Sequence, residues 1–308
     1  MGETMHICYA LHDAGGHFTK FLGTSLLSVL EHASGSVCVH ILLDRSVSEE
    51  NRARLQAVAE DYGQQIVFHE MDDMFARPLR RLRLVRPDLV RARYTVAAFY
   101  RLFLPELFAQ GRFLYLDADT VVTCDVCRFA EFAVGENGVA AASEAQISGQ
   151  KLRLISSMSG VVDPDRYFNS GVLLMDMDQM RGGRDGVELT QKFLDLVASH
   201  VREKYFDQDV LNYFFSQAYA PLPSWAHMLV PARQMQGLWD LPAGVYHFDA
   251  KSLGMFRPDD VYDQLFYEYF SMTPWCDGAF LLRAFSAIRD AAPQRIPEAY
   301  GAQLIGQI

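Results

Sequence analysis

Two hydrophobic periodicities alternate along the first half of the chain. Short, continuously apolar runs predict buried strands at residues 7–11, 37–43 and 65–69. Segments with apolar residues at every third or fourth position predict helices over residues 18–33 and 46–62. Strands separated by helices of this length run mostly parallel in one sheet, with helices on both of its faces.

The second half of the chain continues this alternation. Further strands are predicted at residues 112–116, 139–143 and 171–175, and helices at residues 96–107, 185–202 and 208–216. The last 35 residues are expected to form a helical tail. The pattern predicts an α/β fold, in which a mostly parallel mixed sheet is flanked by helices and followed by a small helical C-terminal tail.

The fourth predicted strand ends in a pair of carboxylates. Asp117 and Asp119 stand one residue apart, directly after the apolar run Phe113-Leu114-Tyr115-Leu116. In an open α/β sheet, ligands bind at the edge where the parallel strands end. An Asp-x-Asp pair there can turn both side chains toward one hard divalent cation, which keeps positions open for phosphate oxygens. For this motif taken alone, a solvated turn with a helix-capping aspartate is the alternative.

Composition narrows the range of ligands and locations. The 308 residues carry a formal net charge of −10, and 50% of them are hydrophobic. Such an acidic chain is unlike a general nucleic-acid binder, and it would need a metal to bridge its carboxylates to an anionic diphosphate. We therefore expect no nucleic-acid partner. There is no apolar run of about 18 residues and no positively charged leader at the start, so we expect a cytoplasmic protein.

The cysteines give no clear sign of a metal or redox role. Cys124 and Cys127 have the spacing of half a zinc site, but no second pair follows them. Cys8 and Cys38 lie inside apolar runs, where a reduced cysteine behaves as a small hydrophobic residue. We therefore expect the cysteines to serve packing.

Two classes of enzyme place an Asp-x-Asp pair after a strand. Haloacid-dehalogenase-like phosphatases use the first aspartate as a nucleophile, and the run from Asp117 to Val121 fits their local pattern. That class also needs a downstream lysine and a second acidic pair. The lysines that follow are in no such setting: Lys151, Lys192, Lys204 and Lys251. Nucleotide-sugar glycosyltransferases, which hold a metal under the diphosphate, are favoured, and the phosphatase is the alternative.

Five segments in order resemble glycosyltransferase family 8, a retaining family that includes bacterial lipopolysaccharide galactosyl- and glucosyltransferases and glycogenin. The resemblance covers roughly residues 5–255, and five ordered motifs are far more specific than Asp-x-Asp alone. The segments are Tyr9-Ala10-Leu11-His12-Asp13, Phe99-Tyr100-Arg101-Leu102 with Leu104-Pro105-Glu106-Leu107, Tyr115-Leu116-Asp117-Ala118-Asp119, Tyr167-Phe168-Asn169-Ser170-Gly171-Val172-Leu173-Leu174 and Phe206-Asp207-Gln208-Asp209-Val210-Leu211-Asn212.

The resemblance implies a GT-A-type, Rossmann-like fold and a metal-dependent, retaining transfer reaction. A hexose, glucose or galactose, would pass from a UDP-sugar to a glycan acceptor with an α-linkage, in the synthesis of lipopolysaccharide or another bacterial surface glycan. The implied metal is Mn²⁺ or Mg²⁺. A single catalytic domain is implied over residues 1–272, with a nucleotide-binding half (1–123) and a donor-sugar and acceptor half (124–272), before the tail (273–308).

The resemblance also implies roles for single residues. The implied metal ligands are Asp117, Asp119 and His247, and the implied catalytic residues are Arg101, Glu144, Asn169, Asp207 and Gln208. The implied contacts of the UDP-sugar are Ala10, Leu11, Asp13, Arg101, Asp117, Ala118, Asp119, Asn169, Asp207, Gln208, His247 and Lys251. Gln208 resembles the residue on the sugar face opposite the leaving group. Because an amide is a poor nucleophile, its residue type does not support a covalent intermediate.

The segment after His247 departs from the family pattern. The family has a glycine followed after two residues by Lys-Pro-Trp, whereas this chain reads Asp249-Ala250-Lys251-Ser252-Leu253. Lys251 is a candidate to reach the diphosphate from a different position. The departure also keeps open a second alternative, a catalytically silent nucleotide-sugar-binding protein.

A basic patch between residues 74 and 94 stands out in this acidic chain. It contains one acid, Asp88, and these arginines: Arg77, Arg80, Arg81, Arg83, Arg86, Arg91 and Arg93. The patch is a candidate contact for anionic membrane lipid or an anionic acceptor, with the protein peripheral on the inner face of a membrane. A solvated surface is the alternative.

Overall fold

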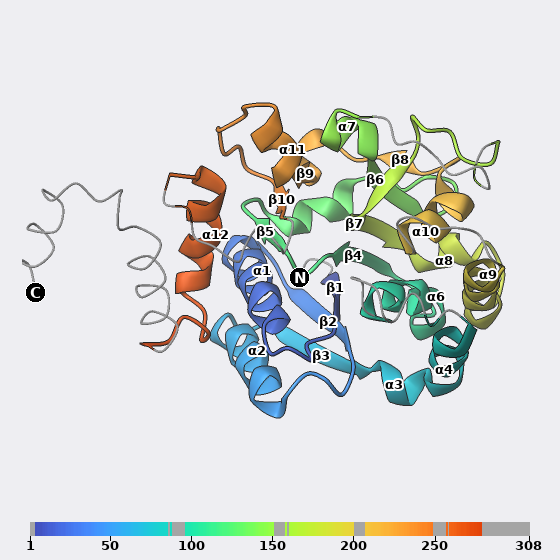
Figure 1. Ribbon diagram of the computed structural model, residues 1–308, viewed down its shortest axis with the longest axis horizontal. Coiled ribbons are helices and arrows are strands. Elements are labelled where there is room, and N and C mark those ends of the chain that lie inside the picture. Colours follow the sequence, from blue (N-terminus) through green and yellow to red (C-terminus); the bar gives the residue numbers. More distant parts are fainter. Residues whose placement is uncertain are drawn as a thin grey trace, which may run out of the picture.

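A seven-stranded sheet forms the centre of the molecule. The structure is a computed structural model, and it describes residues 4–85, 87, 96–150, 158, 160–199, 207–248, 257 and 259–278. The strand order is β3-β2-β1-β4-β7-β6-β8 (Figure 1). The strands are β1 (Met5–Leu11), β2 (Val37–Leu43), β3 (Gln65–Glu70), β4 (Arg112–Leu116), β6 (Val139–Ser143), β7 (Phe168–Asp176) and β8 (Ala220–Pro221).

One strand of this sheet runs against the others. β1 is parallel to β2 and β4, β2 is parallel to β3, and β6 is parallel to β8, whereas β7 is antiparallel to both β4 and β6. The N-terminal end of β7 therefore lies beside the carboxyl end of β4. A second, three-stranded sheet has the order β5 (Thr120–Val122), β10 (Val245–His247), β9 (Met228–Leu229).

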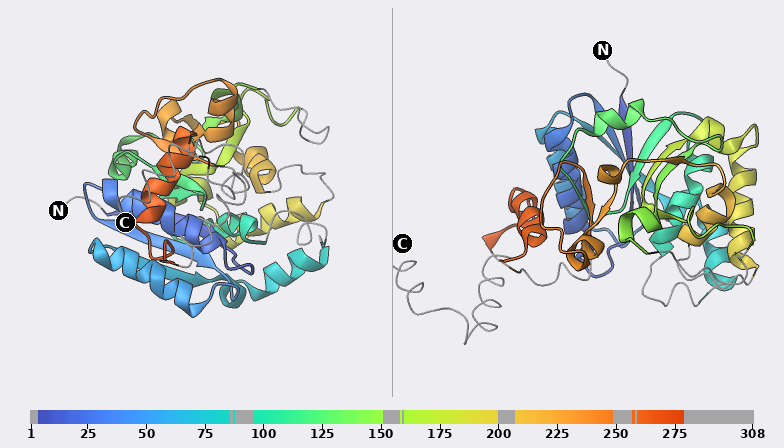
Figure 2. Two further views of the ribbon diagram at one scale, coloured as in Figure 1. Left: turned by 60° about the vertical axis from the view of Figure 1, so that its left-hand side comes forward. Right: turned by 90° about the horizontal axis from the view of Figure 1, so that it is seen from above.

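Helices cover both faces of the central sheet (Figures 1 and 2). One face carries α1 (Phe18–His32), α2 (Glu49–Asp61) and α12 (Val261–Ser271). The other carries α3 (Met71–Met74), α4 (Ala76–Val85), η1 (Val96–Phe103), α6 (Leu104–Leu107), α9 (Gly186–Ala198) and α10 (Asp207–Phe215). The remaining short helices are η2 (Val126–Glu131), α7 (Glu144–Ser148), α8 (Met177–Arg181), η3 (Ser224–Ala226) and α11 (Val230–Met235).

The hydrophobic core consists of two layers, one on each face of the sheet. The alternation of side chains along each strand divides them: Ile7 and Tyr9 of β1 pack under α1, whereas Cys8 faces the layer of η1 and α9. All three side chains are fully buried. Burying both faces explains why β1 and β2 read as continuous apolar runs in the sequence.

The predicted fold class is confirmed, with differences in detail. The predicted helix over residues 96–107 is a 3₁₀ helix followed by α6, because Pro105 stands at the start of α6 and could not donate a backbone hydrogen bond inside a continuous α-helix. The strand predicted at 171–175 begins earlier, at Phe168. The predicted tail lies outside the described residues from position 279 onward. Among the described residues, no helix has the length and apolar character to cross a membrane.

Candidate active site at the carboxyl edge of the sheet

The acidic pair lies where β4 and β7 meet. Leu116, the last residue of β4, pairs with Val172 of β7. The pairing continues one step further, because the backbone N–H of Asp117 donates to the carbonyl oxygen of Gly171 at 2.8 Å. The reversed direction of β7 therefore places Asp117 and the following Asp119 beside the segment that begins at Asn169.

His247 reaches the acidic pair through the small second sheet. Antiparallel pairing of β10 with β5 sets His247 opposite Thr120. Its Nε2 atom lies 3.3 Å from Oδ1 of Asp119 and 3.6 Å from Oδ2 of Asp117. One ligand atom from each of the three side chains lies within 4.8 Å of the other two. The structure thus brings together the three residues that the sequence singled out as metal ligands.

A glycine makes room for this trio. A Cβ atom added to Gly171 would lie 2.3 Å from Cε1 of His247 and 2.8 Å from Oδ2 of Asp117. Non-bonded atoms essentially never come so close. Only a residue without a side chain therefore fits at this point of β7.

The electrostatics of the trio favour a cation. Burial alone lowers the pKa of His247, but the carboxylates of Asp119 and Asp117 outweigh burial and raise the pKa above its ordinary value. A divalent cation could take the place of the proton that these acids attract. Two carboxylates and one imidazole form a donor set suited to Mn²⁺, whereas Mg²⁺ prefers oxygen ligands throughout. The residues present therefore fit a divalent metal.

A second histidine stands behind His247. His227, between η3 and β9, is fully buried, and its Nε2 atom lies 2.9 Å from Nδ1 of His247. Burial, followed by the charge of His247, holds the pKa of His227 well below its ordinary value, so His227 is neutral. A neutral His227 that accepts at Nε2 keeps the proton of His247 on Nδ1 and leaves Nε2 of His247 free for a metal. Nδ1 of His227, which then carries a proton, has no partner in the described part of the chain.

Arg101 ties the acidic pair to the rest of the site. Its Nη2 atom donates to Oδ1 of Asp117 at 2.7 Å, and its Nη1 atom donates to the carbonyl oxygen of Ser170 at 2.6 Å. Its Nε atom lies 3.1 Å from Oδ2 of Asp207. The guanidinium also lies over the ring of Tyr115, 4.3 Å from its centroid. Arg101 is thus a buried cation shared by two carboxylates.

Asp207, at the start of α10, is the most perturbed carboxyl group of the site. Burial raises its pKa to about 6, although the charge of Arg101 acts to lower it. Ser170 Oγ donates to its Oδ2 at 3.3 Å. The group therefore gains or loses a proton near neutral pH, unlike an ordinary aspartate.

Hydrogen bonds hold α10 against β7 and so fix Gln208. The amide oxygen of Gln208 accepts from the backbone N–H of Ser170 at 3.0 Å, and its Nε2 atom donates to the Tyr167 hydroxyl at 3.1 Å. Asn212, one turn further along α10, binds both backbone groups of Phe168 at 2.8 Å each. Gln208 therefore has a defined orientation before any ligand binds.

Glu144 and Asn169 form a separate pair near the trio. Nδ2 of Asn169 donates to Oε2 of Glu144 at 3.1 Å, and Oδ1 of Asn169 accepts from the backbone N–H of Gly171 at 2.9 Å. Burial raises the pKa of Glu144 above its ordinary value. Glu144 begins α7 directly after β6, as the sequence placed it.

The structure does not show a nucleotide contact for the predicted residues at the end of β1 or for Lys251. The carboxylate of Asp13 accepts from the backbone N–H groups of His17 and Phe18 at 2.7 Å each, so it caps the first turn of α1. Leu11 is fully buried, and Ala10 is partly exposed at the carboxyl end of the strand. Lys251 lies outside the described residues. Contact of any of these four with a nucleotide stays a prediction.

Three residues of the site were not singled out from the sequence. Tyr115 donates to Oδ1 of Asp117 at 3.2 Å. Its position two residues before Asp117, on the same face of an extended chain, was a usable sign. Ser170 lies between two residues that were identified. His227 had no sign in the sequence, since no spacing connects it with His247.

Solved structures of glycosyltransferases share this fold. The galactosyltransferase LgtC, solved in complex with donor and acceptor sugar analogs, superposes with a TM-score of 0.63 at 20% identity, over 88% of this chain and 96% of LgtC. The WbbM bifunctional glycosyltransferase superposes with a TM-score of 0.68 at 17% identity, over 89% of this chain and 51% of WbbM. The chain thus has the GT-A glycosyltransferase fold.

Residues 9–246 match the model of glycosyl transferase family 8. The chain belongs to this family and is a glycosyltransferase. The phosphatase alternative is therefore wrong, and family membership favours an enzyme over a silent binding protein. Proteins of this family typically use a divalent metal and a nucleotide sugar.

Curated relatives of the chain include two bacterial lipopolysaccharide glycosyltransferases. The chain is 27% identical to General stress protein A of Bacillus subtilis (strain 168), over 72% of this chain and 73% of that protein. It is 34% identical to lipopolysaccharide 1,2-glucosyltransferase of Escherichia coli (strain K12), over 38% of this chain and 33% of that protein. It is 26% identical to lipopolysaccharide 1,3-galactosyltransferase of Salmonella typhimurium, over 69% of this chain and 64% of that protein.

Proposed function

We propose that this protein is a metal-dependent, retaining hexosyltransferase. It transfers glucose or galactose from a UDP-sugar to a glycan acceptor, with an α-linkage, in the synthesis of lipopolysaccharide or another bacterial surface glycan. The observation that carries the proposal is the convergence of Asp117, Asp119 and His247 at the carboxyl edge of the sheet. The names of the lipopolysaccharide glucosyl- and galactosyltransferases among its relatives support the choice of hexose and acceptor.

In this proposal the two halves of one domain bind different parts of the substrates. Residues 1–123 bind the nucleotide, and residues 124–272 bind the donor sugar and the acceptor. Asp117, Asp119 and His247 hold Mn²⁺ or Mg²⁺, which when bound neutralises charge developing on the leaving diphosphate. Arg101 holds Asp117 in place through the 2.7 Å hydrogen bond to its carboxylate.

The sugar side of the proposed reaction needs no protein nucleophile. Asp207 and Asn169 offer a carboxylate and an amide to sugar hydroxyls, and Glu144 stands on the acceptor side. Gln208 is a poor nucleophile. We therefore favour front-side displacement: the bond from the anomeric carbon to the diphosphate oxygen breaks, the acceptor oxygen bonds to that carbon from the same face, and the acceptor proton passes to the diphosphate.

A donor screen tests the proposal. UDP release would be measured with UDP-glucose, UDP-galactose and UDP-N-acetylglucosamine, with Mn²⁺ and with a chelator, for the wild type, Asp119→Asn and the surface control Asp195→Asn, whose side chain is 56% exposed. We expect metal-dependent release from at least one hexose donor that is lost in Asp119→Asn and kept in Asp195→Asn. Release that is equally fast with chelator would contradict the metal role, and no release from any donor would contradict the hexosyltransferase.

The exposed face of helix α4 supports a further part of the proposal, contact of the protein with anionic lipid at a membrane surface. On α4 the exposed residues Arg77, Arg80, Arg81 and Leu84 follow one another at helical spacing, and Leu84 is 72% exposed. Arg86, Arg91 and Arg93 of the predicted basic patch lie outside the described residues. Cationic side chains flanking an exposed leucine suit the surface of an anionic membrane, where each nearby arginine contributes about 1 kcal/mol.

Vesicle sedimentation tests this contact. Vesicles containing anionic phosphatidylglycerol should retain the wild type at low salt more than neutral phosphatidylcholine vesicles do. The double variant Arg77→Ala/Arg80→Ala should lose that retention, and Arg184→Ala, at an exposed arginine in the loop after α8, should keep it. Equal retention of the α4 variant would show that this helix is an ordinary solvated surface.

A further inference from the structure

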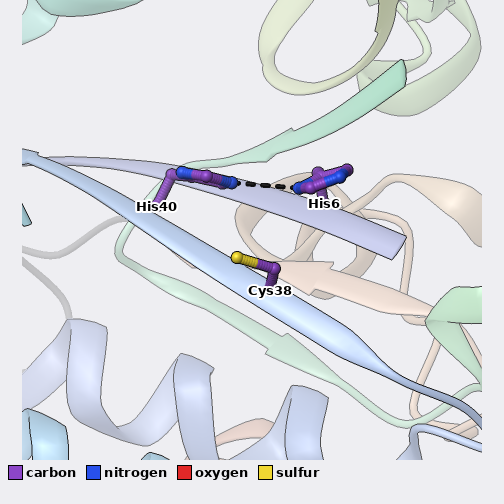
Figure 3. A group of neighbouring side chains, drawn as sticks. All are labelled: His6, Cys38 and His40. Carbon is purple, nitrogen blue, oxygen red and sulfur yellow. Dashed lines mark hydrogen bonds between the residues drawn. The ribbon is translucent and has the colours of Figure 1, made fainter. Parts of the chain in front are cut away.

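A second group of metal-ligating side chains lies at the other end of the sheet from the acidic pair. His6 of β1 and Cys38 and His40 of β2 each place one ligand atom within 4.8 Å of the other two (Figure 3). His6 and Cys38 stand near the N-terminal ends of these parallel strands, whereas Asp117 follows the carboxyl end of β4. None of the three residues belongs to the proposed glycosyltransferase site.

The pairing of β1 with β2 creates this group. In the parallel register, Cys38 lies directly beside His6. His40 follows two positions later on β2, so its side chain emerges on the same face of the sheet. Nδ1 of His6 lies 3.0 Å from Nε2 of His40. A hydrogen bond at this distance holds one proton between the two ring nitrogens, and that proton occupies the position that a cation could take.

The spacing of the two ring nitrogens is close to what a tetrahedral zinc ion needs, and the Cys38 sulfur lies within 4.8 Å of both. Zinc bonds of about 2.0 Å to nitrogen and about 2.3 Å to sulfur place ligand atoms roughly 3.3 to 3.6 Å apart. The two nitrogens, at 3.0 Å, would open by a few tenths of an ångström, and the thiol would move closer within the 4.8 Å limit.

We propose that His6, Cys38 and His40 bind Zn²⁺, with a water molecule as the fourth ligand. Thiolate and imidazole select zinc over Mg²⁺ and Mn²⁺, which favour oxygen ligands. The protein would then hold two cations of different chemistry, one at each end of its central sheet. On binding, the Cys38 thiol gives up its proton to solvent. The proton between His6 and His40 moves to a ring nitrogen that does not bind the metal, so both imidazoles stay neutral and no redox change occurs.

Neighbouring residues support the orientation that the site requires. Nε2 of His69 on β3 lies 3.0 Å from Nδ1 of His40, the ring nitrogen that faces away from His6. Such a partner fixes the ring and the tautomer of a metal-binding histidine. Phe113 packs against both His6 and His40, with ring centroids 5.1 and 5.7 Å away, and restricts their rotation.

The site is also accessible from one side. Cys38 and His40 are each 7% exposed, whereas His6 is less buried than either. The partial exposure of His6 opens this side of the group toward solvent. Cys38 was expected from the sequence to be a small hydrophobic residue, but the sheet places it beside two imidazoles rather than in a purely apolar layer.

Cobalt substitution on the full chain tests the proposal. Co²⁺ bound by a thiolate gives sulfur-to-metal charge-transfer absorption in the near ultraviolet, and the trio of Asp117, Asp119 and His247 contains no sulfur. We expect this absorption to saturate as Co²⁺ is added and to disappear when Zn²⁺ is added. Cys38→Ser should abolish it and the matched control Cys276→Ser should keep it. Absorption that survives Cys38→Ser would overturn the assignment, as would its absence from the wild type.

Two further measurements cover the case in which Cys38→Ser does not fold. His6→Gln changes the least buried ligand, and it should weaken Co²⁺ binding by about 10- to 100-fold. In the wild type, with Mg²⁺ present in excess, Zn²⁺ should raise the melting temperature. No rise, or unchanged Co²⁺ affinity in His6→Gln, would contradict the site. Asp119→Asn should keep the absorption, so the failure of either site can be recognised without reference to the other.

Discussion

Replacing Gly171 by alanine is the most direct perturbation of the proposed metal site that leaves its ligands in place. The added Cβ would lie 2.3 Å from Cε1 and 2.6 Å from Nδ1 of His247, whereas ordinary contact begins at 3.4 Å. The imidazole must therefore retreat by about 1 Å. It cannot do so freely, because His227 lies behind it at 2.9 Å and β10 is paired with β5.

The size of the effect follows from this overlap. Overpacking a well-filled interior costs about 1 to 3 kcal/mol of the free energy of unfolding, which lowers the melting temperature by roughly 2 to 4 °C per kcal/mol in a chain of this size class. Displacing a catalytic group by about 1 Å costs on the order of 100-fold in rate. Gly171→Ala should therefore lose far more activity than stability.

The assay compares activity and folding in the same samples. UDP release would be titrated with Mn²⁺ for the wild type, for Gly171→Ala and for Gly278→Ala, a control in which an added Cβ meets nothing within 4 Å. Thermal unfolding would be recorded for all three. We expect Gly171→Ala to need much more Mn²⁺ and Gly278→Ala to match the wild type. If Gly171→Ala keeps the Mn²⁺ requirement of the wild type, His247 does not hold the metal as argued.

Four further outcomes are expected. Asp119→Asn should abolish transfer without unfolding the protein, and UDP with Mn²⁺ should raise the melting temperature of the wild type alone; an equal rise in both would remove Asp119 from the site. His247→Ala should raise the Mn²⁺ requirement at least about tenfold. Because the raised pKa of His247 lets protons compete with metal as the pH falls, the wild type should lose activity between about pH 7 and 5 more steeply than this variant; parallel profiles would contradict the ligand role. His227→Ala should raise the Mn²⁺ requirement with little change in the KM for the donor. His227→Gln, which offers an amide oxygen, should recover part of the lost Mn²⁺ affinity, whereas an effect on stability alone would make His227 purely structural. Proton NMR of the first-formed product should show an α-linkage, and a β-linkage would refute retention.

The long elements of the fold could be predicted because their patterns are local. β1, β2 and α1 each contain enough apolar residues to show a period of their own. The strands β5 and β10 have three residues each, too few for any period to appear. They exist because they pair with each other, and Thr123 and Gly244, which share a hydrogen bond beside that pair, are 121 positions apart.

The residues of the candidate site also differ in how far the sequence could predict them. Asp117 and Asp119 could be found from the sequence because one short motif contains both. His247 was found through family resemblance, since its place depends on the pairing of β10 with β5. His227 could not be found at all, because a single buried hydrogen bond connects it to His247. The need for a glycine at position 171 depends on how closely His247 and Asp117 approach it, which only the folded structure determines.

The pairing of β5 with β10 has a consequence for how the protein folds. Contacts between distant segments form late, since a long loop must close before they contribute any stability. The parallel strands β1, β2 and β4 can assemble with both carboxylates in place while β10 is still unpaired. A chain at that stage has two ligands and lacks the imidazole, so it should bind Mn²⁺ weakly. In a refolding experiment, recovery of tight Mn²⁺ binding should lag behind formation of the central sheet and mark the moment at which β10 has paired with β5.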